Sequence, residues 1–205
     1  MLDGTLHHFS AGGLYNGLVL LIDDETRTYW DHITGEALHG PLAGRQLERW
    51  SVAVTTVAAA LRDSPGITIS LSGKMSLTAR LFSLLHRRTI GTRGFLPPPF
   101  LMTMGNADHR LPRMTQGLGV AADKARFYPT SAIGDGIEDS WDGRILRVAF
   151  GPVDGVPFAA WEDGGRPFQM FTRWYGFSFS FPGCEIFPGE GSGPARHTRD
   201  FPESS

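Results

Sequence analysis

The chain has 205 residues, of which 41% are hydrophobic and 20% charged, and its formal net charge is −2. These values are typical of a water-soluble globular protein, and the length is sufficient for one domain with a sizeable core. The near-neutral charge and the lack of a basic stripe argue against nucleic acid as a partner. The longest apolar run, residues 17–22, is too short to span a bilayer, so no transmembrane segment is expected.

The cysteine count and the first residues bear on the compartment. Cys184 is the single cysteine, which excludes an internal disulfide and a cysteine-based metal cluster. No basic segment followed by an apolar run precedes the first predicted strand. We therefore expect a cytoplasmic protein if Met1 is the true start, and an exported one if an upstream signal segment is missing.

The first fifty residues predict strands. Short apolar or alternating runs predict strands over 5–10, 18–23 and 27–33, separated by turn signals at 11–13 and 24–26. Residues 35–44 are expected to form a loop, because Pro41 cannot donate a hydrogen bond to a ladder.

The middle of the chain predicts helices and an irregular segment. Small and apolar residues at helical spacing predict a helix over 51–61, followed by a strand over 67–71. Residues 75–88 form the clearest amphipathic pattern, with leucines on one side and arginines on the other. Residues 89–114 show neither a helix nor a strand pattern. The three prolines within 95–100 predict an extended stretch there, a candidate lid or wall.

The second half returns to strand patterns. Strands are predicted over 117–121, 125–128, 145–150 and 158–161. Phenylalanines alternate at positions 177, 179 and 181, which by period favours a strand over 171–181. Residues 189–205 are rich in Gly, Pro, Ser and charge and are expected to be disordered. The whole predicts an α+β fold, β-rich and mainly antiparallel with a few packed helices, in one compact domain over 1–188.

Several segments resemble, in the same order, a bacterial family named as domain of unknown function 3179. They are Tyr15-Asn16-Gly17 with Asp23, the Glu25–Gly44 signature around Trp30 and Gly35, Asp108–Pro112, Gly119-Val120, Tyr128-Pro129, Asp139 and Gly143. The resemblance covers roughly residues 3–187. It implies a fold but supplies almost no chemistry.

The resemblance also implies two related halves, about 1–88 and 107–188, joined by irregular residues 89–106. A Pro-Gly pair before a short apolar strand recurs in both halves, at 65–66 and 182–183. For 171–181 the family implies an aromatic helix instead of a strand. Members usually carry a Cys-Pro-x-Cys-like motif before the position of Asp3, where this chain has only Met1 and Leu2. Either the start is misplaced or part of the first half is lost.

A His-x3-Glu-x2-His pattern makes His32, Glu36 and His39 candidate ligands for a divalent transition metal such as zinc, copper or iron. His7 or His8 from a neighbouring strand would complete the set. Gly35 and Pro41 break any helix here, so the spacing alone fixes no geometry. The alternative is that these side chains satisfy backbone groups in a loop.

The same region predicts an organic pocket. Tyr15, Asn16, Trp30 and Glu36 are candidate ligand-binding residues, with the indole as an apolar wall. Against this, Asn16-Gly17 is a turn pair, and a tryptophan is more often part of a core.

Catalysis is a third hypothesis, with Glu36 or His32 as base and a metal or Arg110 as electrophile. The pattern Asp108-x-Arg110 equally predicts a salt bridge that pins a loop. The sequence thus favours a small-ligand or metal-binding module and leaves two alternatives open: a metal-assisted hydrolytic or redox enzyme, or a truncated structural remnant without activity. It does not determine the oligomeric state.

Overall fold

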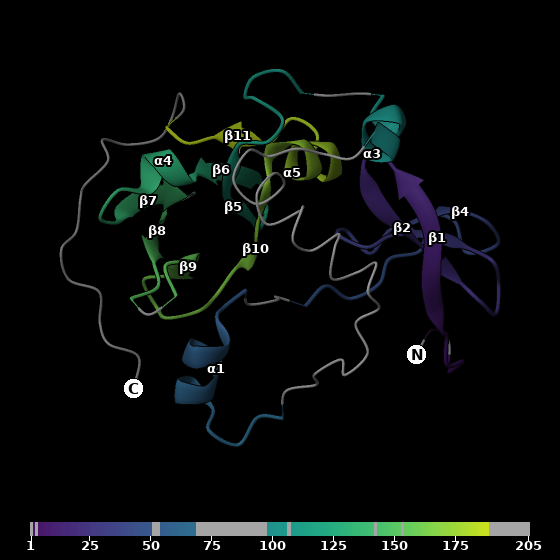
Figure 1. Ribbon diagram of the computed structural model, residues 1–205, viewed down its shortest axis with the longest axis horizontal. Helices are drawn as coiled ribbons and strands as arrows, with labels where there is room; N and C mark the ends of the chain where they lie inside the picture. The colour runs from purple at the N-terminus through teal and green to yellow at the C-terminus, as the bar shows by residue number, and fades with distance from the viewer. Residues whose placement is uncertain are drawn as a thin grey trace, which may run out of the picture.

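The computed structural model describes residues 2, 4–50, 54–68, 98–105, 108–141, 143–152 and 154–188. The predicted helix over 75–88, most of the strand over 67–71 and the tail from 189 lie outside these residues. Three sheets dominate the described chain, and nearly all neighbouring strands are antiparallel (Figure 1). The α+β, β-rich expectation is therefore confirmed.

The N-terminal sheet is an antiparallel meander in the order β1-β2-β3-β4. Its strands are β1 (Phe9–Tyr15), β2 (Leu18–Asp23), β3 (Tyr29–Asp31) and β4 (Ala37–His39). Asn16 and Gly17 both have positive φ, at 48° and 76°, which suits the tight turn between β1 and β2. The predicted turn at 11–13 is wrong, because β1 runs through it with a bulge between Ala11 and Gly13.

Two helices follow in the described residues. Helix α1 (Val57–Asp63) begins after Thr56, whose side chain accepts a hydrogen bond from the Ala59 N–H. It starts later than the predicted helix over 51–61 but ends, as expected, before Ser64. Helix α3 (Pro98–Thr103) overturns the extended prediction at Pro98. The fixed φ of proline suits a first helical turn, where its missing N–H is not needed.

The second half forms two sheets. In one the order is β10-β5-β6-β11, and β11 pairs with β6 in parallel; in the other it is β7-β8-β9. The elements are β5 (Gln116–Ala121), β6 (Ala125–Pro129), α4 (Thr130–Ile133), β7 (Ile137–Trp141), β8 (Arg144–Phe150), β9 (Pro157–Trp161), β10 (Phe168–Arg173), α5 (Trp174–Ser180) and β11 (Glu185–Ile186).

Residues 174–180 of the aromatic segment form the helix α5 that the family resemblance implies, whereas 171–173 belong to β10, so the strand prediction holds only there. In α5, Trp174 and Phe177 are three positions apart and therefore share one face, which packs on Phe127 of β6. Gly119 of β5 lies under the Phe177 ring, and a Cβ there would come within 2.2 Å of a ring atom. The absent side chain at Gly119 thus sets how closely α5 approaches the sheet.

The main core lies between the two second-half sheets. Its buried side chains come from β5, β6, α4, β7, β8, β9 and residue 187. A buried ionic contact joins the sheets inside this core: Arg126 of β6 pairs with Asp139 of β7, and Tyr128 Oη donates to Asp139 Oδ2 at 2.5 Å. The carboxylate therefore serves two residues on the same face of β6.

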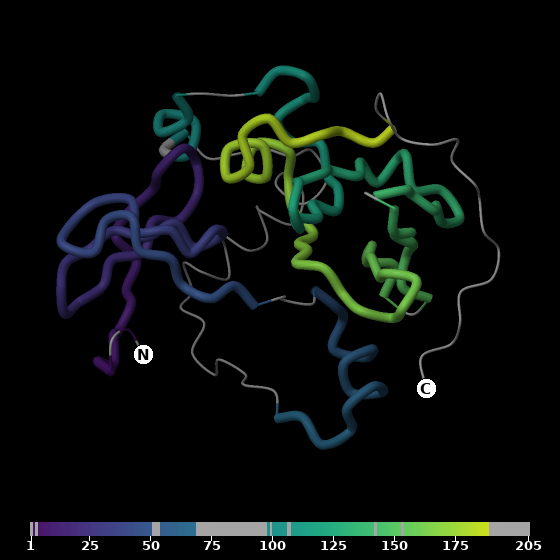
Figure 2. Tube along the Cα trace, turned by 180° about the vertical axis from the view of Figure 1, so that it is seen from behind, coloured from purple at the N-terminus to yellow at the C-terminus, as the bar shows by residue number. Residues whose placement is uncertain are grey.

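The first hairpin connects the N-terminal sheet to the rest. The Gly17 N–H donates to Thr103 Oγ1 at 3.0 Å, and the Gly105 N–H donates to Asn16 Oδ1 at 3.1 Å. The Tyr15 ring meets Phe179 of α5 edge-on, with centroids 5.3 Å apart. Figure 2 shows this hairpin beside α3 and α5, away from the β7-β8-β9 sheet. None of the described helices is long and apolar enough for a membrane crossing.

Candidate metal centre

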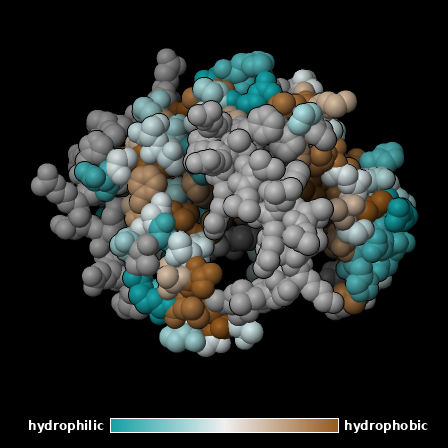
Figure 3. Space-filling view, in the orientation of Figure 1, coloured by the Kyte–Doolittle hydropathy of each residue, from teal (hydrophilic) through white to brown (hydrophobic). Residues whose placement is uncertain are grey.

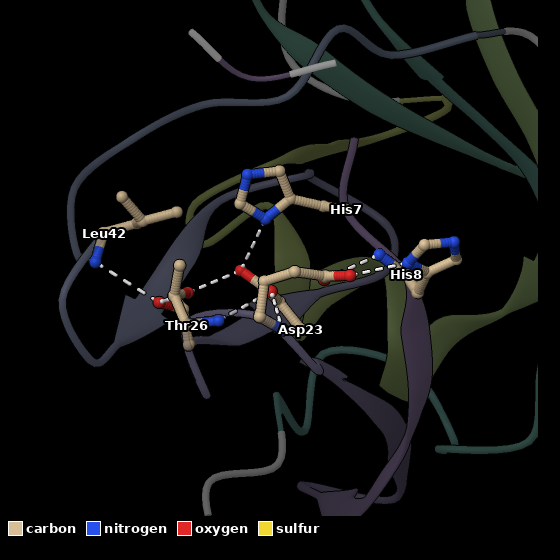
Figure 4. A network of polar contacts seen from close by, with 7 residues as sticks. His7, His8, Asp23, Thr26 and Leu42 are labelled. Atoms are coloured by element: carbon tan, nitrogen blue, oxygen red, sulfur yellow. Dashed lines mark hydrogen bonds and ion pairs between the residues drawn. The ribbon is translucent and has the colours of Figure 1, made fainter. Parts of the chain in front are cut away.

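Asp23 organises the turn that joins β2 to β3. Its Oδ1 accepts hydrogen bonds from the Glu25 N–H at 2.9 Å and the Thr26 N–H at 3.0 Å, and its Oδ2 accepts from Thr26 Oγ1 at 2.5 Å (Figure 4). An aspartate that binds the backbone two and three residues ahead is typical of a tight turn. The predicted turn at 24–26 is thus present, and Asp23 is completely buried within it.

His7 lies against this buried carboxylate. Its side chain is only 7% exposed, and Nδ1 lies 3.0 Å from Asp23 Oδ2. The two atoms are within ion-pair range but lack the alignment of a hydrogen bond, and Nδ1 has no hydrogen-bond partner among the described residues. Because buried polar atoms are nearly always hydrogen-bonded, this nitrogen is an exception among the described residues, as is Trp30 Nε1 in the N-terminal sheet.

Glu25 brings a second carboxylate to the same place. Its Oε2 accepts from the His8 backbone N–H at 2.8 Å, and its Oε1 lies 2.5 Å from His8 Nδ1. One ligand atom each from His7, Asp23 and Glu25 lies within 4.8 Å of the others. Donor atoms on a shared metal with bonds of about 2.1 Å are about 3–4 Å apart, so small side-chain movements would close this set.

Both carboxylates are held in their ionised form. Burial opposes ionisation of Asp23, but the hydrogen bonds from Thr26 outweigh it and hold the pKa of Asp23 below its usual range. The hydrogen bond from His8 likewise lowers the pKa of Glu25, while the hydrogen bond to Glu25 raises the pKa of His8. Ionised carboxylates beside an imidazole are a ligand set suited to zinc and similar divalent ions.

The loop after β4 is hydrogen-bonded, through Thr28, to the turn that contains Asp23. Thr26 Oγ1 lies 2.7 Å from Thr28 Oγ1, and the Leu42 N–H donates to Thr28 Oγ1 at 3.3 Å (Figure 4). Thr28 is completely buried. The turn that holds Asp23 is thereby linked to the segment that carries the sequence-predicted ligands.

Those predicted ligands, His32, Glu36 and His39, are all exposed. His39 lies on β4 opposite Tyr29, and Glu36 forms an isolated bridge with Gln46. None of the three belongs to the group of close ligand atoms found among the described residues. The sequence marks His7 and His8 only as completing ligands. Its acidic run at 23–25 is typical of a turn and gives no sign that Asp23 and Glu25 lie beside these histidines.

The residues of the predicted organic pocket have separate structural surroundings. Trp30 is completely buried in the N-terminal sheet, with Phe9 packed edge-on at 6.0 Å. Asn16 and Tyr15 lie in the junction with α3 and α5 described above, and Glu36 is exposed. None of the four lines the cavity between α1 and the second-half sheets that is described below.

Arg110, the predicted electrophile, forms the alternative salt bridge. Its Nη2 donates to Asp108 Oδ2 at 2.7 Å, and its guanidinium lies 5.3 Å from the Trp174 ring centroid. The Trp174 indole N–H donates to the Asp108 carbonyl oxygen at 2.9 Å. Hydrogen bonding from Arg110 lowers the pKa of Asp108. The geometry therefore fits a residue that fixes its loop to α5.

Comparison with known proteins gives a family but no activity. Residues 3–136 match the family described as "Protein of unknown function (DUF3179)". The matched stretch is more than half of the chain and contains the His7, Asp23 and Glu25 cluster, but it ends before β7, earlier than the resemblance through 187 suggests. No curated protein and no solved structure matches the chain.

Proposed function

The chain belongs to the DUF3179 family, and we propose that it is a metal-binding module whose site consists of His7, Asp23 and Glu25. The ion is a divalent transition metal, with zinc the first candidate for one imidazole and two carboxylates. The observation that carries the proposal is the buried His7 ring, whose Nδ1 has no hydrogen bond to any described residue and lies 3.0 Å from Asp23 Oδ2.

The surrounding turn favours metal binding over a simple ion pair. Two backbone N–H groups fix Asp23 through Oδ1, so Oδ2 is left facing His7. Residues that orient a ligand from behind are a regular part of metal sites. An ionised carboxylate, the form in which Asp23 is held, is also the protonation state that a metal requires. When an ion binds, the hydrogen bonds from Thr26 Oγ1 to Asp23 Oδ2 and from His8 Nδ1 to Glu25 Oε1 would break, which frees these oxygens for the metal.

The test separates this site from the sequence-predicted one. The wild type, His7→Gln and the double variant His32→Gln/His39→Gln are purified without an affinity tag, incubated with zinc and desalted. Elemental analysis then gives the metal content. We expect near-stoichiometric zinc in the wild type and in the double variant, and its loss in His7→Gln.

Circular dichroism serves as the control, because His7 is buried and its replacement must leave the sheet folded. Zinc retained in a folded His7→Gln variant but lost from the double variant would move the site to His32 and His39. Zinc absent from all three proteins would refute metal binding and leave the Asp23 turn with a structural role.

A further inference from the structure

A cavity of about 410 Å³ lies between α1 and the two second-half sheets, away from the His7 cluster. Residues of α1, β5, β9 and β10 line it, so it lies where the two sheets and a helix of the first half meet. Cavities of this size at such junctions are the usual sites of small organic ligands.

Apolar and polar side chains share the lining of the cavity. The apolar lining residues include Ala59, Leu118, Val156, Phe158, Met170 and Phe171. Ala59 is the buried residue of α1, whereas Val57 and Leu61 on the same helix are exposed. In Figure 3 apolar side chains gather along the lower edge of the molecule, in the region of α1. The lining therefore suits the hydrocarbon part of a ligand.

Most polar groups of the lining are already engaged. Asp154 accepts from Thr55 Oγ1 at 2.6 Å and from the Val156 N–H at 3.0 Å. Hydrogen bonds from Thr55 and Val156, together with the charge of Arg62, lower the pKa of Asp154. Gln169 exchanges hydrogen bonds with both backbone groups of Ala159. These groups hold α1 and the sheets together and have little capacity left for a ligand.

The two arginines of the lining differ. Arg62 pairs with Asp63, with Nε and Oδ1 3.2 Å apart. Arg166, in the connection between β9 and β10, has no ion pair or hydrogen bond within the part of the chain that the structure describes. Its guanidinium is a fork of donors suited to a carboxylate. The lining thus combines apolar side chains with a guanidinium that has no partner among the residues described.

From this arrangement we propose that the cavity binds a small amphipathic carboxylate, with its hydrocarbon chain against the β5, β9 and β10 side chains and its carboxylate on Arg166. A neutral ligand of the same length would use the apolar lining but not the arginine. The proposal is independent of metal binding at His7.

The experiment compares octanoate with 1-octanol by isothermal titration calorimetry. We expect saturable octanoate binding to the wild type, weakened about fivefold in Arg166→Gln, the size expected for a solvent-accessible ion pair. Binding of 1-octanol should not change in that variant. Ala59→Leu places a larger side chain in the cavity and should weaken both ligands. Arg113→Gln, an exposed arginine outside the lining, is the matched control and should bind like the wild type.

Thermal melts establish that each variant is folded. Because Arg166 is exposed, its replacement does not disturb the core and remains a valid test if Ala59→Leu does not fold. Absence of saturable octanoate binding would overturn the proposal, as would equal octanoate affinity in the wild type and Arg166→Gln. Unchanged binding of both ligands to a folded Ala59→Leu variant would place them elsewhere and also overturn it.

Discussion

Replacing Asp139 by asparagine should destabilise the protein far more than replacing Glu185 by glutamine. Both carboxylates pair with Arg126, whose side chain is 8% exposed, but Asp139 is completely buried whereas the Glu185 side chain is 42% exposed. Removing one partner of a buried ion pair leaves an uncompensated charge and costs about 3–5 kcal/mol. Since Glu185 still contacts Arg126, we expect the low end, about 3 kcal/mol, for Asp139→Asn.

The exposed carboxylate, Glu185, provides the reference for the loss of free energy of unfolding. Glu185→Gln should cost about 1 kcal/mol or less, the usual value for a pair accessible to water. Urea unfolding followed by tryptophan fluorescence gives both free energies of unfolding, provided that the slope with urea concentration is the same for each variant. Equal losses for the two variants would refute the reasoning that burial at Asp139 decides the cost.

The double variant Arg126→Met/Asp139→Leu provides an internal check. With both buried charges replaced by apolar side chains, only the partly exposed Glu185 loses a partner, and replacing a buried ion pair in this way is often neutral or stabilising. We therefore expect the double variant to be more stable than Asp139→Asn alone. Asparagine at 139 keeps a carbonyl oxygen that can accept from Tyr128 Oη, whereas leucine does not, so the double variant also loses this hydrogen bond, a smaller cost than an unpaired buried charge.

Three further predictions concern the sheet, the turn and the first helix. Gly119→Ala should cost about 1–3 kcal/mol in urea unfolding, because the new methyl group meets the Phe177 ring; an unchanged midpoint would show that α5 can move aside. The raised pKa of His8 means that its contribution to stability is full below its ordinary pKa of 6.5 and is lost as pH rises through the higher folded value. The lowered pKa of Glu25 gives a contribution that is present above pH 4.5 and lost as pH falls through the lower folded value. Wild type and Glu25→Gln should therefore differ most in melting temperature between about pH 4.5 and 6.5. At about pH 9 the difference should shrink to the part that the His8 backbone N–H supplies, and a constant difference would contradict this. Thr56→Ala should reduce stability by about 1 kcal/mol, measured by urea unfolding, through loss of the α1 cap, whereas the flanking Ser64→Ala, which caps through its backbone, should have little effect.

The sequence predicts local features of this fold better than the contacts that join distant segments. The turns at Asn16-Gly17 and at Asp23 follow from the chemistry of a few neighbouring residues, and both are present. The extended prediction at Pro98 failed because proline restricts φ to a value that an extended chain and a first helical turn share. The spacing of the phenylalanines likewise could not show that Phe177 lies on a helix packed over Gly119, since Gly119 is 58 residues away in the chain.

In the candidate site, too, the sequence indicates single residues but not the contacts between distant segments. His7 and His8 stand out in the sequence as candidate ligands, but the pairing of β1 with β2 determines which carboxylates they meet. Phe9 lies opposite Asp23 in that register, so the residues just before Phe9 reach the turn after Asp23. The distance along the chain between His7 and Asp23 gives no hint of this contact, whereas the His32 to His39 pattern is visible without any fold.

The order β10-β5-β6-β11 determines how this protein can be divided. The residues that match the family end at 136, so they include β5 and β6 but neither of the strands that flank them. A fragment cut at that boundary would present two open strand edges and would expose Leu118 and Val120, which are buried against β7, β8 and β9 in the intact protein. Such a fragment is expected to aggregate, and expression trials aimed at the His7 site should retain the chain through Phe187.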